Sequence, residues 1–305
     1  MWLGAHLGIS GGLADAVREA RKIGCDALQI FSKSPQMWAG PPIAVAAAEE
    51  FRAAVRAEEI RATAVHHGYL ANLGSPNASG LQRSRAAFVD ELRRAELLNV
   101  DALIFHPGAH LGSGVDAGLK TIAESLRTAL EAVPEGRVRI LLENAAGQGT
   151  TLGSTFEELS SVLTQVDRPD RLGVALDTCH LFAAGFDFRS EDGYGNLVDQ
   201  IDRVLGSPTV RAFHLNDAKE APGSHLDRHE NIGKGEIGIE GFRHLLSDAR
   251  WKETPGYLET PLDDRGYARY AADLRTLRSL VGREAAAGPH PPARRRSAPR
   301  GSTVK

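Results

Sequence analysis

The sequence predicts a single (β/α)8 barrel, and three observations lead to that prediction. Short apolar runs alternate with longer amphipathic segments along the chain, as in a parallel sheet whose strands are each followed by a helix. The alternation occurs eight times, which is the number that a closed TIM barrel requires. The 305 residues are 42% hydrophobic, enough for one large α/β domain with a sizeable core.

Each expected strand is a short, nearly continuous apolar run followed by Gly, Pro or polar residues, the pattern of a buried strand. The eight expected strands are Trp2–Leu7, Ala27–Phe31, Ala62–His66, Ala102–Phe105, Val138–Leu142, Leu172–Leu176, Val210–Leu215 and Gly256–Leu258. An open doubly wound sheet is the alternative, and its dinucleotide-binding form carries a GxGxxG turn after the first strand. The GISGG stretch after Leu7 matches that turn poorly, so the barrel is favoured.

A segment with helical apolar spacing follows every strand. In order, these segments are residues 10–24, 45–58, 81–98, 118–133, 156–165, 196–205, 239–248 and 267–281. They complete eight strand-and-helix units.

The C-terminal end differs in composition from the rest of the chain. From Arg283 onward there are six Lys or Arg and one acid, whereas the whole chain has a net charge of −3. We therefore expect a barrel domain over residues 1–283 and a disordered, basic, Pro- and Arg-rich tail over residues 284–305. The tail could contact nucleic acid through its charge, although a solvated terminus without a function is the simpler interpretation.

Cysteine usage and hydropathy indicate the compartment. Cys25 and Cys179 are the two cysteines, and they are far apart and in no metal-binding spacing. That usage favours a reduced, cytoplasmic protein without disulfides. No signal peptide is evident at the N-terminus, and no run approaches the roughly 20 apolar residues of a membrane span.

The stretch from Phe213 to Gly238 contains several residues of the types that bind metals. His214 ends an apolar run, and Asp227 and His229 follow on a loop rich in Gly, Pro and charge. Asp227 and His229 are two residues apart, so on an extended segment they point the same way. Carboxylate and imidazole together are typical ligands of a divalent metal.

Similar residues stand at the C-terminal ends of the third to eighth strands, which converge on one face of a barrel. Taken singly, a His or Glu at a strand end is usually a hydrogen-bonded framework residue. Four carboxylates and five imidazoles together would resist burial without a compensating cation. Since one zinc accepts about four ligands, the set suits two or three metals. The nine candidates are His66, His106, Glu143, Asp177, His180, His214, Asp227, His229 and Glu259.

Several motifs in this chain are similar to those of a known family. They are HPGAH, ENAAGQG, LDTCHLFAAGFD, FHLNDAK, and LDRH followed by GKGEIG. With them the chain resembles endonuclease IV, the zinc-dependent apurinic/apyrimidinic endonuclease of bacterial base-excision repair. The likeness extends from Gly4 to about Asp264.

The resemblance implies a (β/α)8 barrel with three zinc ions, one of which Mn²⁺ could replace. It implies that Glu143 bridges the first two ions and is the catalytic carboxylate. The implied ligand sets are His66, His106 and Glu143; Glu143, Asp177, His214 and Glu259; and His180, Asp227 and His229.

The implied reaction is hydrolysis of the phosphodiester on the 5′ side of an abasic site in duplex DNA. The metals would activate water and neutralise charge on the phosphate. The products would be a 3′-hydroxyl and a 5′-deoxyribose phosphate, and the same site would trim blocked 3′ ends. We expect a monomer that binds damaged DNA and no membrane.

The resemblance also suggests DNA contacts. Tyr69, Leu70 and Asn72 match the family's insertion loop, and Arg228 is a candidate phosphate contact. Apolar wedges of this kind unstack a base step. Without the resemblance, ordinary loop packing would be the better interpretation of Tyr69 and Leu70. Gln36 stands where well-known members place an inserting arginine, which weakens the transfer of these details.

Two other functions compete. A sugar isomerase or epimerase of the xylose-isomerase-like group would use Glu143, Asp177, His214 and Glu259 alone, but it would leave the other five candidates without a use. A metal-binding module without catalysis is the second alternative, and a full ligand set argues against it.

Overall fold

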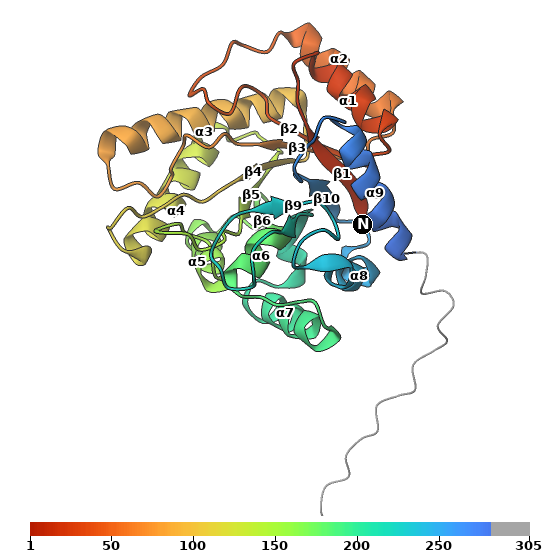
Figure 1. Cartoon of the computed structure of the whole chain (residues 1–305). Coiled ribbons are helices and arrows are strands. Elements are labelled where there is room, and N and C mark those ends of the chain that lie inside the picture. The colour runs from red at the N-terminus through yellow and green to blue at the C-terminus, as the bar shows by residue number, and fades with distance from the viewer. Residues whose placement is uncertain (282–305) are drawn as a thin grey trace, which may run out of the picture.

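A computed structural model describes residues 1–281, which form a closed parallel barrel surrounded by helices (Figure 1). The strand order is β1-β10-β7-β6-β5-β4-β3-β2, so each barrel strand lies beside its neighbours in sequence and the first closes on the last. The predicted (β/α)8 barrel is thereby confirmed. The barrel strands are β1 (Trp2–Leu7), β2 (Ala27–Ile30), β3 (Ala62–His66), β4 (Ala102–Phe105), β5 (Arg139–Glu143), β6 (Leu172–Asp177), β7 (Val210–His214) and β10 (Pro255–Leu258). The predicted tail, residues 284–305, and the predicted domain boundary at residue 283 lie outside the described residues.

Helices form the outer layer and follow the strands in turn (Figure 1). Among the described residues, none of them is long and apolar enough to cross a membrane. The helices are α1 (Leu13–Lys22), α2 (Val45–Ala57), α3 (Ala78–Leu98), α4 (Val115–Ala132), α5 (Phe156–Val166), α6 (Thr178–Ala184), α7 (Glu191–Val204), α8 (Gly238–Ser247) and α9 (Ala268–Val281), with 3₁₀ turns η1 (Ser207–Thr209) and η2 (Ala249–Trp251).

The hydrophobic core consists of two clusters, one between the strands and the helices and one inside the barrel. The larger cluster packs strands against helices. The smaller one consists mainly of small side chains, because the interior of an eight-stranded barrel is narrow. Its members are Ala27, Ala62, Ala64, Ala102, Ile104, Leu141, Ala175, Ala212 and Tyr257.

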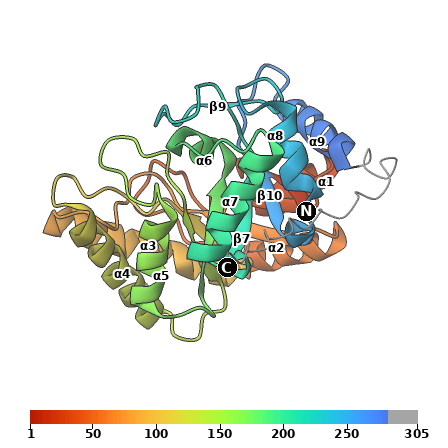
Figure 2. The ribbon, with the colours of Figure 1, turned by 90° about the horizontal axis from the view of Figure 1, so that it is seen from below.

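A short helix and a small sheet lie above the C-terminal ends of the strands, and the sequence did not predict either (Figure 2). Helix α6 begins where the side chain of Asp177 accepts a hydrogen bond from the amide of His180, and it ends at Gly185, which has a φ of 110°. The sheet pairs β8 (Asp217–Ala218) with β9 (His229–Glu230) in antiparallel fashion. Both elements stabilise loops that leave the barrel mouth.

Helix boundaries differ from prediction most clearly at α7, which begins at Glu191 instead of residue 196. The hydroxyl of Ser190 accepts a hydrogen bond from the amide of Gly193 and caps the helix. Glu191 and Asp192 add negative charge to the first turn, where it interacts favourably with the helix dipole. The two glycines near this start concealed the beginning of the helix in the sequence.

Candidate metal centre

The period of two along a β-strand explains why polar side chains gather at the barrel mouth. Successive side chains of a strand point to opposite faces, so a residue two positions beyond an interior residue also points inward. Seven polar residues stand two positions after an interior core residue: Gln29, His66, His106, Glu143, Asp177, His214 and Glu259. The sequence therefore aims one inward polar side chain from each of seven strands at the same space.

Glu143 is wholly buried and has four histidines within 3.5 Å of its carboxylate. Its Oε2 is 3.0 Å from Nε2 of His66 and 3.5 Å from Nδ1 of His106. Its Oε1 is 2.9 Å from Nδ1 of His214 and 3.4 Å from Nδ1 of His180. One carboxylate therefore faces two groups of imidazoles on opposite sides.

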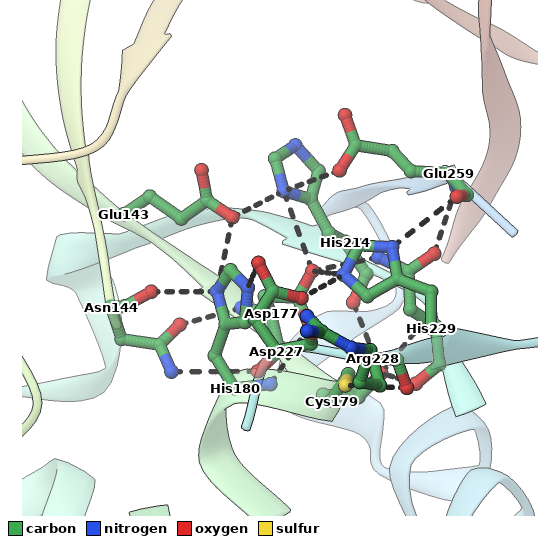
Figure 3. Close-up of polar contacts among 12 residues, drawn as sticks. Glu143, Asn144, Asp177, Cys179, His180, His214, Asp227, Arg228, His229 and Glu259 are labelled. Carbon is green, nitrogen blue, oxygen red and sulfur yellow. Dashed lines mark hydrogen bonds and ion pairs between the residues drawn. The ribbon is translucent and has the colours of Figure 1, made fainter. Parts of the chain in front are cut away.

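A second carboxylate, Asp227, lies between His180 on α6 and His229 on β9 (Figure 3). Its Oδ2 is 3.1 Å from Nε2 of His180, and its Oδ1 is 3.0 Å from Nε2 of His229. The Asp227 side chain is 45% exposed, whereas that of His180 is 3% exposed. This part of the cluster is thus the more open to solvent.

The structure brings all nine residues singled out in the sequence into one cluster. Their donor atoms form groups within which every atom lies no more than 4.8 Å from the others. Three of these groups together contain all nine residues: His66, His106 and Glu143; Glu143, Asp177, His214 and Glu259; and His180, Asp227 and His229. Nitrogen and oxygen donors at this spacing suit zinc or a similar divalent cation.

Three of the histidines are oriented by a ring nitrogen that faces a backbone carbonyl. Nδ1 of His66 donates to the carbonyl of His67 at 2.8 Å, and Nδ1 of His180 donates to the carbonyl of Asn144 at 2.9 Å. Nδ1 of His229 lies 3.3 Å from the carbonyl of Glu259. In its neutral form, each ring then keeps a lone pair on the other nitrogen, which is the usual state of a metal-binding histidine.

The charges of the cluster shift its pKa values strongly. Burial alone would raise the pKa of Glu143, but the imidazoles of His106 and His214 outweigh burial and hold it well below its usual value. Burial would lower the pKa of His214, yet the carboxylates of Glu259 and Glu143 raise it to about 9. Neighbouring carboxylates outweigh burial at His229 as well, and its pKa is also raised to about 9. Without a metal, these two imidazoles hold protons that a cation would displace.

Two asparagines beside the cluster were missed in the sequence. The side chain of Asn216 donates to Asp177 at 2.7 Å and accepts from the amide of Glu259 at 2.9 Å. The side-chain oxygen of Asn144 accepts from the amide of Asp177 at 2.6 Å. Asn144 directly follows Glu143, and one residue separates Asn216 from His214. The signal in the sequence that could have revealed them was an asparagine within two residues of a strand-end His or Glu.

His6 and Gln29 were also missed. Both are on the first two strands and extend the ring of polar side chains around the mouth. Nδ1 of His6 is 2.9 Å from Oε1 of Glu259, and Nε2 of Gln29 is 2.7 Å from the same oxygen. A glutamine inside the apolar run ALQIF was a visible anomaly in the sequence.

Asp217 organises the loop that follows the cluster. Its wholly buried carboxylate accepts hydrogen bonds from the amides of Gly233, Gly235 and Ile237 at 2.9–3.0 Å. A Cβ on Gly235 would lie 2.2 Å from the carbonyl oxygen of Ala218, so only glycine fits. The HLNDAK and GKGEIG motifs are thus two halves of one folded loop.

Two apolar side chains stand exposed at the rim of the cluster. Tyr69 is 66% exposed and Leu70 is 40% exposed. The Tyr69 ring stacks on His106 with centroids 6.2 Å apart and meets the edge of Phe31 at 5.8 Å. Gln36 is also exposed, on the segment after β2. A Cβ on Gly68 would lie 2.8 Å from the carbonyl of Pro35, so the two segments touch.

The other two residues predicted to contact DNA are placed differently. The side chain of Asn72 donates to the carbonyl of Ala109 at 2.8 Å, and its oxygen accepts from the amides of Ala109 and Gly74 at 3.0 Å. Asn72 therefore braces the loop that carries Tyr69. The side chain of Arg228 is exposed and donates to the carbonyl of Asp227 at 2.7 Å, which holds its guanidinium close to the cluster (Figure 3).

Comparison with known proteins places the chain in a family. A family profile described as "Xylose isomerase-like TIM barrel" matches residues 17–280. A "Probable endonuclease 4" of Chlorobium luteolum is 46% identical over 281 residues, covering 91% of this chain and 99% of that protein. The chain belongs to the endonuclease IV family. Membership of the endonuclease IV family makes it a nuclease and a hydrolase.

Solved structures agree with this assignment. The crystal structure of endonuclease IV from Thermus thermophilus superimposes with a TM-score of 0.82 at 35% identity, covering 92% of this chain and 99% of that chain. A D-psicose 3-epimerase from Clostridium cellulolyticum superimposes with a TM-score of 0.69 at 18% identity, covering 92% and 99%. At that identity the epimerase shares the fold alone, so the likeness to endonuclease IV carries the functional argument.

Proposed function

We propose that the chain is a zinc-dependent endonuclease of DNA repair that incises duplex DNA at abasic sites. It hydrolyses the phosphodiester on the 5′ side of the site and leaves a 3′-hydroxyl and a 5′-deoxyribose phosphate. It also removes blocking groups from 3′ ends. The observation that carries the proposal is the set of nine nitrogen and oxygen donors at the barrel mouth of an endonuclease IV family member.

The donor chemistry fits three zinc ions, because the groups can each supply three or four ligands and zinc accepts about four. The first ion is assigned to His66, His106 and Glu143. The second is assigned to Glu143, Asp177, His214 and Glu259, and the third to His180, Asp227 and His229. When bound, such ions supply a Lewis acid and an activated water to phosphodiester hydrolysis.

The residues of the chain have distinct parts in this proposal. Glu143 turns one oxygen to His66 and the other to His214, so it would be a ligand of both cations and is the proposed catalytic carboxylate. Asp227 is half-exposed and forms the side of the site from which a phosphate would enter. Arg228, next to it, is a proposed contact to a phosphate oxygen.

Recognition of an abasic site relies on shape, because there is no base to read. Tyr69 exposes apolar surface beside His106, and Leu70 is the next exposed side chain in the chain; both are proposed to fill the gap left when the abasic nucleotide leaves the stack. Gln36, on the neighbouring segment, is proposed to contact the same region through its amide. Asn72 supports the wedge by holding its loop.

A cavity beside the cluster has room for an extruded group. It has a volume of about 290 Å³ and lies between the loops after β3, β4 and β5. Tyr69, His106, Gln148, His180 and Asp227 are among its lining residues. A flipped sugar-phosphate entering this cavity would bring its phosphate to the proposed metal ligands.

The test is to incubate metal-replete protein with an end-labelled duplex that contains one abasic site and to map the cut. We expect a single incision 5′ to the site and loss of the activity in chelator. Elemental analysis of protein purified without chelator is expected to give about three zinc ions per chain. A reproducible value near one would favour an isomerase or epimerase centred on Glu143, Asp177, His214 and Glu259.

We further propose that the protein acts as a cytoplasmic monomer and that Mn²⁺ can replace zinc in one position. Cys25 and Cys179 are both buried and unpaired, which agrees with a reducing compartment. Sedimentation of metal-loaded protein tests the oligomeric state.

A further inference from the structure

His214 differs from its neighbouring histidines in what orients it. His66, His180 and His229 direct their outer nitrogen to backbone carbonyls, which no substitution can delete. The outer nitrogen of His214, Nε2, instead lies 2.9 Å from the side-chain oxygen of Gln29. The orientation of His214 therefore depends on a side chain that the sequence is free to change.

The amide of Gln29 can adopt one orientation in this environment. Its Nε2 is 2.7 Å from Oε1 of Glu259, and an ionised carboxylate only accepts hydrogen bonds. The nitrogen must therefore face Glu259, which leaves the carbonyl oxygen facing His214. Nδ1 of His6 is 2.9 Å from the same Glu259 oxygen and donates to it as a second donor beside the amide.

The orientation of the amide then fixes the tautomer of His214. A carbonyl oxygen only accepts, so Nε2 of His214 carries the hydrogen. Nδ1 keeps its lone pair for a cation, and it faces Glu143 at 2.9 Å, Glu259 at 3.5 Å and Asp177 at 3.8 Å. Those three carboxylates are the other members of its donor group.

We call the hydrogen-bonded series Glu259, Gln29 and His214 the relay, and burial makes it rigid. Gln29 and His214 are both 0% exposed, so water does not compete for their hydrogen bonds. An unpaired amide there would cost free energy, and Gln29 avoids that cost by using both ends of its side chain. The opposite tautomer of His214 would place two hydrogen-bond acceptors against each other.

We infer that Gln29 is a positioning residue of the metal centre, which sets His214 and Glu259 as a pair for one cation. The inference rests on the proposed function, because it concerns the second of the proposed zinc positions. It assigns to the second strand, which contributes none of the nine donors, a part in building the site. Gln29 touches neither DNA nor the reacting atoms in this role.

The test compares Gln29→Met with wild type and with a matched control, Thr63→Val. Met has nearly the volume of Gln but cannot form the relay. Thr63 is equally embedded in the barrel, and its hydroxyl donates to Asp101 at 3.0 Å, so Thr63→Val also removes a buried hydrogen bond. Zinc content and zinc release to a competing chelator are measured for all three, without DNA.

We expect Gln29→Met to weaken retention of one zinc ion by about 10–100-fold, as for other groups that orient a metal ligand. Thr63→Val should retain zinc like wild type even if it lowers stability. In zinc-loaded protein with ¹⁵N-labelled histidine, the Nε2–H signal of His214 should be present in wild type and lost or fast-exchanging in Gln29→Met. Gln29→Glu keeps the oxygen that faces His214 and should restore that signal.

Equal zinc retention by Gln29→Met and Thr63→Val, with unchanged histidine spectra, would overturn the inference. If wild type itself bound no zinc stoichiometrically, the proposed function would fail instead. The two failures are therefore distinguishable. Should Gln29→Met not fold, Gln29→Leu, which likewise cannot form the relay, decides the matter by the same criteria.

Discussion

Nδ1 of His214 lies 2.9 Å from Oε1 of Glu143, and both side chains are wholly buried. The other oxygen of Glu143 is 3.0 Å from Nε2 of His66, which is on another strand of the barrel. A single carboxylate thus connects donors from β3 and β7 through β5. At this position Glu143 would be a ligand shared by two of the proposed cations.

Glu143→Gln is expected to lower incision of abasic duplex at least about a hundredfold, the scale of losing one strong electrostatic contact in the transition state. The amide has the same shape but carries no charge and presents one acceptor instead of two. Glu96→Gln is the matched control, because Glu96 accepts the amides of Arg137 and Val138 at the other end of the barrel. Single-turnover cleavage of a labelled duplex measures the effect, and wild-type rates for Glu143→Gln would remove this residue from the mechanism.

Tyr69→Ala and Leu70→Ala are each expected to weaken cleavage of abasic duplex by about tenfold, since Tyr69 loses a stacking contact worth about 1–3 kcal/mol and Leu70 loses apolar area that would be buried against the DNA. Removal of a 3′ block at a frayed end should be spared, because less unstacking is required there. Leu111→Ala is the control, as Leu111 is 60% exposed but follows β4 instead of β3. Equal losses on both substrates would point to general damage and refute the wedge.

Gln36→Arg is expected to tighten binding to abasic duplex, and more so at low salt. The exposed side chain would gain a charge that attracts phosphate and a guanidinium that stacks on bases. Binding titrations over a range of salt concentrations test this, with Gln165→Arg as a control at an exposed position on helix α5, outside the mouth. An unchanged salt slope for Gln36→Arg would show that this position does not face the DNA backbone.

The spacing of residues accounts for what could be predicted from the sequence. Strand-end donors such as His66 and Glu143 fall two positions after interior residues, and this period of two can be recognised in the sequence alone. Gln29 follows the same rule, but as an amide it does not look like a ligand, so it was missed. Helix α6 depends on a side-chain cap from Asp177, which the sequence shows only as a neighbouring polar residue.

Zinc binding is expected to release protons at pH 7.5. His214 and His229 have pKa values raised to about 9, so they are protonated at that pH in the metal-free protein, whereas a metal takes the neutral imidazole. The apparent zinc affinity should therefore rise with pH until it passes about 9. Calorimetric titrations in two buffers of different ionisation enthalpy measure the released protons. Identical heats in both buffers would contradict the raised pKa values.

A buried ion pair anchors the segment that carries Gln36. The ammonium group of Lys33, whose side chain is 5% exposed, contacts the carboxylate of Glu91 on α3, which is 1% exposed. The hydroxyl of Ser32 donates to the same carboxylate, and Asp90 lies 3.3 Å from the ammonium. These partners are 57 to 59 residues apart in sequence, which is why no local pattern revealed the contact.

Lys33→Met is expected to destabilise the fold by about 3–5 kcal/mol, because it leaves the Glu91 carboxylate buried without its cation. The double substitution Lys33→Met with Glu91→Met should recover most of that loss, since two apolar side chains of similar length replace the pair. Lys22→Met is the matched control: its side chain is 75% exposed and pairs with Glu19 at the surface, where such a pair contributes little. Chemical denaturation of zinc-loaded protein gives the free energies of unfolding.

Abasic-duplex binding should be weaker than wild type in the stable double variant, because the segment with Gln36 has lost the charged anchor that holds it beside Gly68. If the double variant bound DNA like wild type, the ion pair would matter for stability alone and not for placing Gln36.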